Sequence, residues 1–268
     1  MSAFLSSQPG SAIVTTLRAA GCVFAEDEAQ LLVASACTPE ELAVMVERRV
    51  AGEPLEHVLG WAEFCGLRIA VDPGVFVPRR RTALLVEQAA RLARRGSVVL
   101  DLCCGSGAVG VAIAAAVDGV ELHAAELEPA AARCAARNVG AVGGHVHQGD
   151  LYGALPAALR GRVDVLVVNA PYVPTEAIAL MPPEARDHEP RIALDGGADG
   201  LDVQRRVAAG AGEWLAPGGH LLIETSRRQA PLTEADFACN GLDPRTVGSA
   251  ELDATVVIGA MTGRPQGE

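Results

Sequence analysis

The stretch Val165-Leu166-Val167-Val168-Asn169-Ala170-Pro171-Tyr172 joins an apolar run of strand composition to a polar end. An unbroken run of Val and Leu is typical of a strand that is buried on both faces of a parallel sheet. Pro171 has no N–H group to donate to a sheet, so the strand must end before it. Ligands of open α/β sheets bind at the carboxyl ends of the strands. The stretch therefore predicts a parallel sheet with a ligand site at its Asn169 end.

Three kinds of chemical group meet at the end of this predicted strand. Asn169 carries a primary amide, residue 170 a backbone carbonyl free of sheet pairing, and Tyr172 an aromatic face. Together they suit a planar amino or amide group, held by its N–H bonds while an aromatic ring packs against it. An ordinary Asn-x-Pro turn would have the same sequence, so the stretch alone leaves both interpretations open.

From residue 97 onward the pattern alternates between strands and helices, which is typical of a parallel sheet covered on both faces. The final two predicted strands are too close for a crossover helix and should form an antiparallel hairpin at one edge. We therefore predict an α/β fold with a Rossmann-like, seven-stranded sheet and one reversed strand. Strands are expected at residues 98–102, 120–127, 145–148, 163–168, 219–225, 245–248 and 255–260, and helices at residues 107–117, 129–138, 201–215 and 231–239.

The first 60 residues lack this alternation and have the apolar spacing of a small helical unit. Thr38-Pro39-Glu40-Glu41 combines a capping box with proline at the first helical position. Residues 62–77 change to a strand-like period and predict a hairpin that turns near Gly66. The run Arg79-Arg80-Arg81 precedes a helix expected from Ala83. Because the helix dipole disfavours cations at a helix N-terminus, this run indicates an acidic partner nearby.

The chain has a formal net charge of −11, and all of its basic residues are Arg because it contains no Lys. The absence of Lys excludes a Schiff-base lysine and the Lys of a P-loop. The acidic balance disfavours general nucleic-acid binding, although a local Arg cluster could still dock phosphates. No apolar run is long enough to span a bilayer and no secretion signal is present, so we expect a soluble, cytoplasmic protein. The seven Cys and six His lack metal-ligand spacing, which predicts reduced thiols and no metal site.

The first strand of the alternating region passes into its helix through Asp101-Leu102-Cys103-Cys104-Gly105-Ser106-Gly107. Glycines in such a turn let the backbone approach a ligand closely. Glu126 ends the next strand, where a carboxylate can accept hydrogen bonds from both hydroxyls of a ribose. Asp150 ends the third strand, where it could meet an adenine amino group. The ligand is therefore predicted to be a nucleoside derivative.

Two nucleoside cofactors fit this pattern. Gly105-x-Gly107-x-x-Gly110 formally matches the dinucleotide fingerprint, so the pattern alone does not exclude a nicotinamide dinucleotide. Asp101, however, suits a cationic amino-acid group better than a pyrophosphate, which favours S-adenosylmethionine. The predicted cofactor-binding residues are Asp101, Cys103, Cys104, Gly105, Ser106, Gly107, Glu126, Leu127, Asp150, Leu151 and Asn169.

A wider set of motifs runs from about Glu28 to Ile258. The motifs are Gly52-Glu53-Pro54-Leu55-Glu56-His57-Val58-Leu59-Gly60, Glu63-Phe64-x-Gly66-Leu67, Phe76-Val77-Pro78-Arg79-x-x-Thr82, Asp101–Gly107, Asn169–Tyr172, Glu189-Pro190 with Ala193-Leu194-x-Gly196-Gly197-x-x-Gly200-Leu201-Asp202, and Leu215-x-Pro217-Gly218-Gly219. With them the chain resembles the protein-glutamine methyltransferases that modify the Gly-Gly-Gln loop of peptide-chain release factors. The Glu-Pro and Gly-Gly-x-x-Gly-Leu-Asp block discriminates best, because general methyltransferases lack it.

The resemblance implies methyl transfer from S-adenosylmethionine to the side-chain amide nitrogen of a protein glutamine, with S-adenosylhomocysteine as product. Asn169 Oδ1 and the Ala170 carbonyl would accept both N–H bonds of the substrate amide, and Tyr172 would pack on its plane. It also implies a helical substrate-recognition domain at residues 1–60, a hairpin linker at 61–82 and a methyltransferase domain at 83–268. The implied catalytic residues are Asn169, Ala170, Pro171 and Tyr172, and the implied substrate-binding residues are Phe76, Arg79 and Glu189.

The chain departs from the family's pattern at Cys103, Ala170, Arg80-Arg81 and Thr225, where the family typically has Gly, Pro, Pro with an acidic residue, and Gly. Two alternatives therefore stay open. One is an amino-methyltransferase acting on adenine or guanine of a nucleic acid, whose flipped-out amine presents the same donors. The other is a cofactor-binding protein that has lost catalysis. The expected partner is a release factor or another protein with an exposed Gln, and a nucleic acid is the less favoured substrate.

Overall fold

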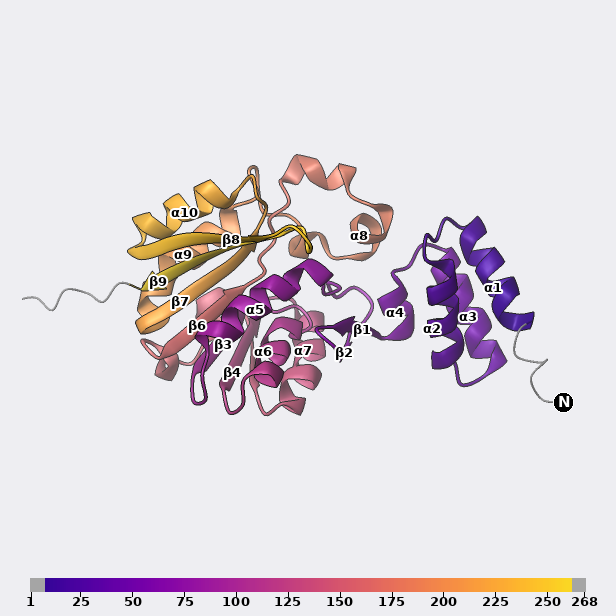
Figure 1. The fold of residues 1–268 in the computed structure, drawn as a ribbon, viewed down its shortest axis with the longest axis horizontal. Coiled ribbons are helices and arrows are strands. Elements are labelled where there is room, and N and C mark those ends of the chain that lie inside the picture. Colours follow the sequence, from indigo (N-terminus) through magenta and orange to yellow (C-terminus); the bar gives the residue numbers. More distant parts are fainter. Residues whose placement is uncertain (1–7, 262–268) are drawn as a thin grey trace, which may run out of the picture.

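The structure, a computed structural model, describes residues 8–261. Its centre is a seven-stranded sheet with the strand order β5-β4-β3-β6-β7-β9-β8 (Figure 1). Neighbouring strands from β5 to β7 pair in parallel, whereas β9 is antiparallel to both of its neighbours. The predicted Rossmann-like sheet with one reversed strand and a hairpin edge is confirmed. The strands are β3 (Val98–Leu102), β4 (Glu121–Glu126), β5 (His145–Gln148), β6 (Val163–Val168), β7 (Leu215–Thr225), β8 (Leu242–Ser249) and β9 (Ala254–Met261).

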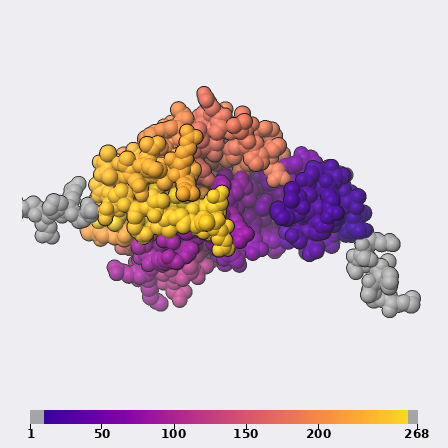
Figure 2. All heavy atoms as spheres, turned by 45° about the horizontal axis from the view of Figure 1, so that its top comes forward, coloured from indigo at the N-terminus to yellow at the C-terminus, as the bar shows by residue number. Residues whose placement is uncertain are grey.

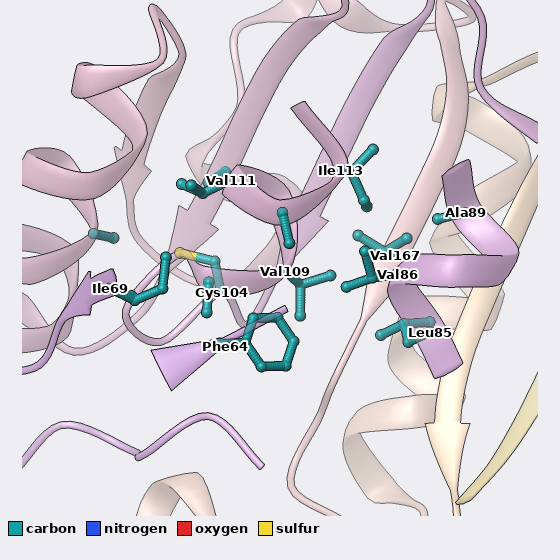
Figure 3. Close-up of a cluster of buried hydrophobic side chains, with 14 of the residues drawn as sticks. Phe64, Ile69, Leu85, Val86, Ala89, Cys104, Val109, Val111, Ile113 and Val167 are labelled. Atoms are coloured by element: carbon teal, nitrogen blue, oxygen red, sulfur yellow. The ribbon is translucent and has the colours of Figure 1, made fainter. Parts of the chain in front are cut away.

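Helices cover both faces of the sheet, and each face closes over its own apolar cluster. One face carries α5 (Ala83–Leu92), α6 (Ala108–Ala116) and α7 (Pro129–Ala141); the other carries α9 (Asp202–Trp214) and α10 (Ala230–Cys239). Figure 3 shows part of the first cluster, in which Val109 lies next to Phe64 and Val86 lies near Val167. Burial of one such side chain stabilises the fold by roughly 1.5–3 kcal/mol. The sheet is therefore a rigid base for the groups at its strand ends.

The N-terminal helices form a separate lobe in Figure 2, with an apolar cluster of their own. They are α1 (Gln8–Ala19), α2 (Ala25–Ser35), α3 (Pro39–Val50) and the short α4 (Leu55–Leu59). The predicted cap is present, since Thr38 Oγ1 accepts a hydrogen bond from the Glu41 N–H at 3.1 Å. The buried Arg49 links α3 to Glu28 at 2.6 Å and to Glu184 at 2.7 Å. The division of the chain at residues 60 and 82 into domains stays a prediction.

The predicted hairpin is formed by β1 (Trp61–Phe64) and β2 (Leu67–Ala70), which pair antiparallel. Asn138 of α7 fixes it to the sheet, because its amide nitrogen donates to the carbonyls of Ala70 at 2.9 Å and Ser106 at 2.8 Å. Ser106 belongs to the predicted cofactor turn. The hairpin and the turn are thus held by one side chain.

The Arg run finds its acidic partners within the chain. It leads into a 3-10 helix, η1 (Arg80–Thr82), directly before α5. Arg79 pairs with Glu189 at 2.5 Å, Arg80 approaches Glu251 at 3.9 Å, and Arg81 approaches Glu224 at 3.4 Å. The sequence indicated an acidic partner but not where it would come from.

Residues 173–200, for which the sequence predicted no helix or strand, form a long connection between β6 and α9. It contains η4 (Thr175–Leu180), α8 (Pro183–His188) and η5 (Arg191–Ala193), and in Figure 1 it lies between the sheet and the N-terminal helices. A parallel bridge between Val173 and Asp195 closes its base. The connection therefore starts and ends beside the Asn169 strand end.

Two differences from the predicted elements have a clear origin. β7 begins at Leu215 rather than at residue 219, because Pro217-Gly218 is accommodated by a shift in register between Val163 and Val165 of β6. β8 is also longer than predicted, because its pairing to β9 continues through Pro244. Between residues 8 and 261 no helix is long and apolar enough to cross a membrane. Over the same residues, no group of three or more His, Cys, Asp or Glu side chains is placed to hold a metal ion.

Candidate active site

Three strand ends meet at one edge of the sheet. β4, β3 and β6 are adjacent and parallel, so the turn after β3, the end of β4 and the end of β6 lie together. The predicted Asp101–Gly107, Glu126 and Asn169 come from these three ends. A single cavity is lined by residues from all of them.

The turn after β3 needs left-handed backbone at three positions. The φ angles are 55° at Cys103, 56° at Gly105 and 79° at Gly107, and Gly107 caps the N-terminus of α6. A Cβ atom on Gly107 would lie 2.7 Å from Val139, so this glycine is required by packing as well. At Cys103 a side chain is tolerated, at the cost of an unfavourable backbone conformation of about 1–2 kcal/mol.

Glu126 holds the turn in place from the end of β4. Its Oε2 accepts from the Gly105 N–H at 2.8 Å and its Oε1 from the Glu128 N–H at 2.9 Å. Burial raises the pKa of this carboxyl, and these backbone donors oppose the rise. Each carboxylate oxygen has further lone pairs, so a ribose hydroxyl can still donate to it.

Asp101 lines the cavity and is buried. Burial raises the pKa of this carboxyl to about 7, although the Gly110 N–H donates to its Oδ2 at 2.8 Å. A Cβ atom on Gly110 would come within 3.2 Å of the same oxygen, which explains the glycine there. A buried carboxylate of this kind is stabilised by a cation and not by a phosphate.

The far side of the cavity is formed by residues 149–151 and by α9. Asp150 lines the cavity and forms an ion pair with Arg206 at 2.6 Å. Leu151 has a positive φ of 46° and its side chain is buried. Leu127 is 43% exposed beside them and presents an apolar surface to the cavity. Apolar walls with a few carboxylates suit a nucleoside base and its sugar.

At the end of β6, Asn169 lines the cavity, and its amide nitrogen lies 3.4 Å from Thr82 Oγ1. Ala170 is buried, and Pro171 lines the cavity next to it. Tyr172 turns toward η1, where the Arg81 guanidinium lies 5.8 Å from the centre of its ring. Burial raises the pKa of the Tyr172 phenol to about 12, so it stays protonated at neutral pH.

Two glycines of the 173–200 connection pack directly on this strand end. A Cβ atom on Gly196 would lie 2.7 Å from the Pro171 carbonyl oxygen, and one on Gly200 would lie 2.2 Å from the Tyr172 carbonyl oxygen. Gln229 completes the contact, because its Nε2 donates to the carbonyls of Tyr172 and Asp199, each at 2.9 Å. The Gly-Gly-x-x-Gly block therefore has a structural reason: its backbone lies against the backbone of the predicted catalytic residues.

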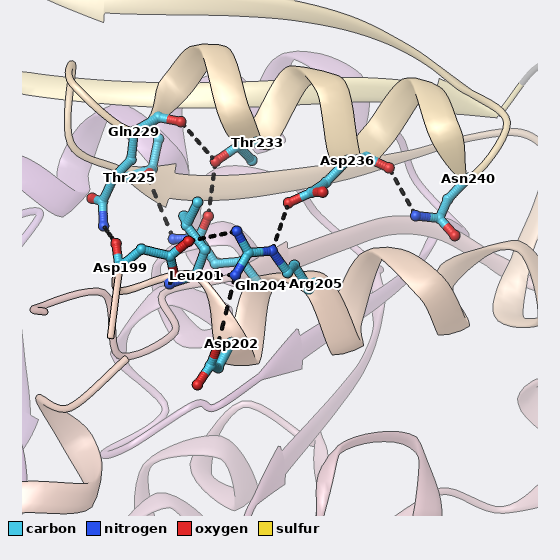
Figure 4. A network of polar contacts seen from close by, with 10 residues as sticks. All are labelled: Asp199, Leu201, Asp202, Gln204, Arg205, Thr225, Gln229, Thr233, Asp236 and Asn240. Carbon is cyan, nitrogen blue, oxygen red and sulfur yellow. Dashed lines mark hydrogen bonds and ion pairs between the residues drawn. The ribbon is translucent and has the colours of Figure 1, made fainter. Parts of the chain in front are cut away.

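A polar network holds Gln229 and the connection in place, as Figure 4 shows. Thr233 donates to Gln204 Oε1 at 3.0 Å, and Gln204 donates to Thr225 at 3.4 Å. Arg205 pairs with Asp199 at 2.6 Å and lies 3.5 Å from Asp236. Helices α9 and α10 are thereby tied to the end of β7.

The three predicted substrate-binding residues contact one another beside the cavity. Phe76 lines it, with the Arg79 guanidinium 4.8 Å from its ring centre. Glu189 is buried, and its two oxygens accept from the Val77 N–H at 3.0 Å and from Arg79 at 2.5 Å. Burial raises the pKa of Glu189, and Arg79 opposes this. Glu189 therefore reaches a substrate only through Arg79.

Most of the predicted site residues line the cavity, but Gly107, Ala170, Tyr172, Arg79 and Glu189 are not among the lining residues. Cys103 and Cys104 line it with thiols whose pKa burial raises, so both stay protonated. The sequence predictions missed lining residues contributed by distant segments, which carry no local motif. They are Pro78, Thr82, Ala108, Val109, Ala125, Glu128, Ala131, Gly149, Pro190, Ile192, Ala193, Val203 and Arg206.

The donor set of the cavity fits S-adenosylmethionine better than a dinucleotide. Asp101, Glu126, Glu128 and Asp150 bring four carboxylates to the cavity. Within residues 8–261, the one basic side chain that lines it, Arg206, is paired with Asp150. A pyrophosphate would face these carboxylates without a counter-charge, whereas an ammonium and ribose hydroxyls would find acceptors.

The chain is similar in sequence to known methyltransferases. Residues 66–181 match the family model of the methyltransferase small domain. The chain is 41% identical over 208 residues to a release factor glutamine methyltransferase of Geobacter sulfurreducens, covering 76% of this chain and 72% of the relative. It is 40% identical over 203 residues to the 4-amino-L-phenylalanine/4-methylamino-L-phenylalanine methyltransferase of Streptomyces pristinaespiralis, covering 73% of this chain and 69% of the relative.

A solved structure supports the same fold. A methyltransferase from Pyrococcus furiosus matches 74% of this chain and 90% of its own, with a TM-score of 0.56 and 16% sequence identity. The sheet order, the acidic cavity and the sequence matches agree with one another. The chain belongs to the release factor glutamine methyltransferase family of S-adenosylmethionine-dependent N-methyltransferases.

Proposed function

We propose that the protein transfers a methyl group to the side-chain amide nitrogen of a glutamine in a protein, namely the Gly-Gly-Gln loop of a release factor. The observation that carries this proposal is that Asn169 and the turn after β3 line the same cavity. A substrate amide held at Asn169 is then next to the cofactor. The similarity to release factor methyltransferases supports the same acceptor.

Each predicted cofactor-binding residue suits a different part of S-adenosylmethionine. Asp101 pairs with the ammonium of S-adenosylmethionine, Glu126 accepts from the ribose hydroxyls, and Asp150 with Leu127 and Leu151 holds the adenine. When bound, this cofactor supplies an electrophilic methyl group on its sulfonium. The neutral thiols of Cys103 and Cys104 fill the wall beside it without competing as nucleophiles.

The substrate amide is a poor nucleophile, because its nitrogen lone pair is delocalised into the carbonyl. Asn169 Oδ1 and the Ala170 carbonyl accept its two N–H bonds and thereby orient the nitrogen toward the cofactor side of the cavity. Tyr172 supports the amide plane, and Pro171 fixes the backbone between them. Such orientation accelerates the reaction, because the reacting atoms are already held in the geometry of attack.

Substrate protein reaches the site past Phe76, which lines the cavity, and its neighbour Arg79. Arg79 is only partly exposed and is held by Glu189, so its free N–H groups point in a fixed direction. The proposed partner is a cytoplasmic release factor. A nucleic acid is a poor partner for a chain with a net charge of −11 and no Lys.

The direct test uses the purified protein, S-adenosylmethionine and release factors, with mass spectrometry of the Gly-Gly-Gln peptide. One added methyl group on the glutamine is expected, and none on a release factor whose glutamine is replaced by alanine. Parallel reactions offer DNA, RNA and 4-amino-L-phenylalanine. The last compound is included because one relative carries its name. Methylation of one of these in place of the release factor would redirect the proposal to an aromatic amine.

Glu126→Ala should weaken cofactor binding by about 10- to 150-fold. The variant loses charge-assisted hydrogen bonds of roughly 1.5–3 kcal/mol to the ribose, and it frees the Gly105 N–H from its partner. Calorimetry with S-adenosylhomocysteine measures the effect. Glu128→Ala is the matched control, since it removes one carboxylate from the same cavity and keeps the Glu126 contacts. Equal dissociation constants for Glu126→Ala and the wild type would remove Glu126 from the site.

Cofactor affinity should rise with pH through about 7, the value to which burial raises the pKa of Asp101. Below this pH the carboxyl is protonated and cannot neutralise the cofactor ammonium, so the dissociation constant should increase as pH falls. Titrations between pH 6 and pH 8 would measure the slope. Asp101→Asn should bind more weakly and with less dependence on pH. A wild-type affinity that is constant over this range would contradict the assignment.

A further inference from the structure

Asn169 has a polar neighbour that the sequence does not associate with it. Thr82, the last residue of η1, is 1% exposed, and its Oγ1 lies 3.4 Å from the Asn169 amide nitrogen. A hydroxyl has one proton to donate and two lone pairs that accept. If Thr82 accepts from the NH₂ group of Asn169, its own proton must go elsewhere.

Glu224 lies beside Thr82, and a hydrogen bond from the Thr82 side chain favours its charged form. It follows Ile223, which pairs with Val168 across β6 and β7, so Glu224 and Asn169 are neighbours at the same sheet edge. Glu224 is 2% exposed, and its Oε2 has no hydrogen-bond partner among residues 8–261, the one buried side-chain atom there of which this holds. Such an acceptor is costly unless a donor reaches it.

The direction of these hydrogen bonds matters for the chemistry. A carboxylate can only accept hydrogen bonds, so the Thr82 hydroxyl donates its hydrogen bond to Glu224. Toward Asn169, Thr82 then offers only its lone pairs. The NH₂ group of Asn169 must then turn toward Thr82, and its Oδ1 must turn toward the cavity. The opposite amide orientation would present donors to a substrate amide that itself offers two donors.

We propose that Thr82 and Glu224 are positioning residues that fix the side-chain amide of Asn169 with its oxygen facing the substrate. This inference rests on the proposed function of Asn169 as acceptor for a substrate amide. Nothing in the motif around Asn169 requires the two residues, because Thr82 comes from η1 and Glu224 from β7. Both act through Asn169.

Arg81 lies beside the carboxylate of Glu224 and favours its charged form. Its Nε lies 3.4 Å from Glu224 Oε1. Burial raises the pKa of Glu224, while Thr82, Arg81 and Tyr172 beside it lower it. Arg81 replaces an acidic residue of the family pattern, so in this chain a cation stabilises the charged form. Protonated Glu224 would donate to Thr82, and Thr82 would then donate to Asn169, which reverses both hydrogen bonds. We therefore expect kcat to fall as the pH falls through the pKa of Glu224.

The experiment compares Thr82→Val with Thr82→Ser, using the full chain, S-adenosylmethionine and a release factor. Valine keeps the shape of threonine and removes the hydroxyl, whereas serine keeps the hydroxyl. We expect kcat to fall by about tenfold or more in Thr82→Val and to stay within about threefold in Thr82→Ser, with unchanged cofactor affinity in both. In Glu224→Gln, the fall of kcat at low pH should disappear. Wild-type kcat in Thr82→Val, or equal loss in both Thr82 variants, would overturn the proposal.

A second measurement does not depend on which protein accepts the methyl group. The side-chain NH₂ resonance of Asn169, identified by its loss in Asn169→Ala, should exchange with solvent faster in Thr82→Val than in Thr82→Ser. Equal exchange in the two variants would also overturn the proposal. If the wild type fails to methylate the release factor, the proposed function fails, and this resonance still decides whether Thr82 orients Asn169.

Discussion

Asn169→Ala should lower kcat for release factor methylation by about 10³-fold while the cofactor dissociation constant stays within a few-fold of the wild type. The variant loses the side-chain acceptor that orients the substrate amide, and one precisely aimed polar group of this kind is worth about 10²–10³ in kcat. The proposed cofactor contacts lie mainly on the turn after β3 and on Glu126, which the change does not touch. Single-turnover methyl transfer, together with calorimetry, measures both quantities.

The matched control is Asn240→Ala, which removes an exposed amide that follows α10 and donates to the Asp236 carbonyl of that helix. It should transfer methyl groups at the wild-type rate. Asn169→Asp adds information, because aspartate keeps an acceptor oxygen but has no N–H for Thr82. Turnover close to the wild type in Asn169→Ala would mean that the end of β6 is not where the substrate is held.

The fold was predictable because its signals are local. The apolar run at residues 163–168 and the alternation after residue 97 are properties of neighbouring residues, and parallel pairing then places Asp101, Glu126 and Asn169 at one edge. The start of β7 was missed because Pro217-Gly218 is a turn signal. In the folded chain, a change of register between β6 and β7 accommodates it.

The rest of the site was not predictable because its signals are not local. Thr82 and Gln229 each act on the end of β6 from more than 50 residues away, by 87 and 57 positions respectively. No spacing rule joins such residues. The Arg run shows the same limit: its charge indicated an acidic partner, but only the fold identifies Glu189 and Glu224.

Gly200→Ala should reduce kcat by about 100-fold and lower the melting temperature. The glycine has a φ of +80°, and an added Cβ atom would lie 2.2 Å from the Tyr172 carbonyl oxygen and 2.4 Å from Gln229 Nε2. Neither neighbour can move alone, because Gln229 donates to both Tyr172 and Asp199 at 2.9 Å. Residues 170–172 must therefore shift with it, and a misplacement of about 1 Å costs about 10²-fold. Kinetics and thermal unfolding measure the two effects.

The control separates backbone strain from the steric contact. Gly218 has nearly the same φ, +77°, and a Cβ atom there would meet nothing within 4 Å. Gly218→Ala carries the same left-handed strain of about 1–2 kcal/mol, so it should lower the melting temperature by a few degrees and leave kcat unchanged. If Gly200→Ala behaves like Gly218→Ala, its cost is strain alone. The connection at residues 173–200 would then not support the end of β6. A selective loss of kcat in Gly200→Ala means instead that this backbone contact sets the position of the catalytic residues.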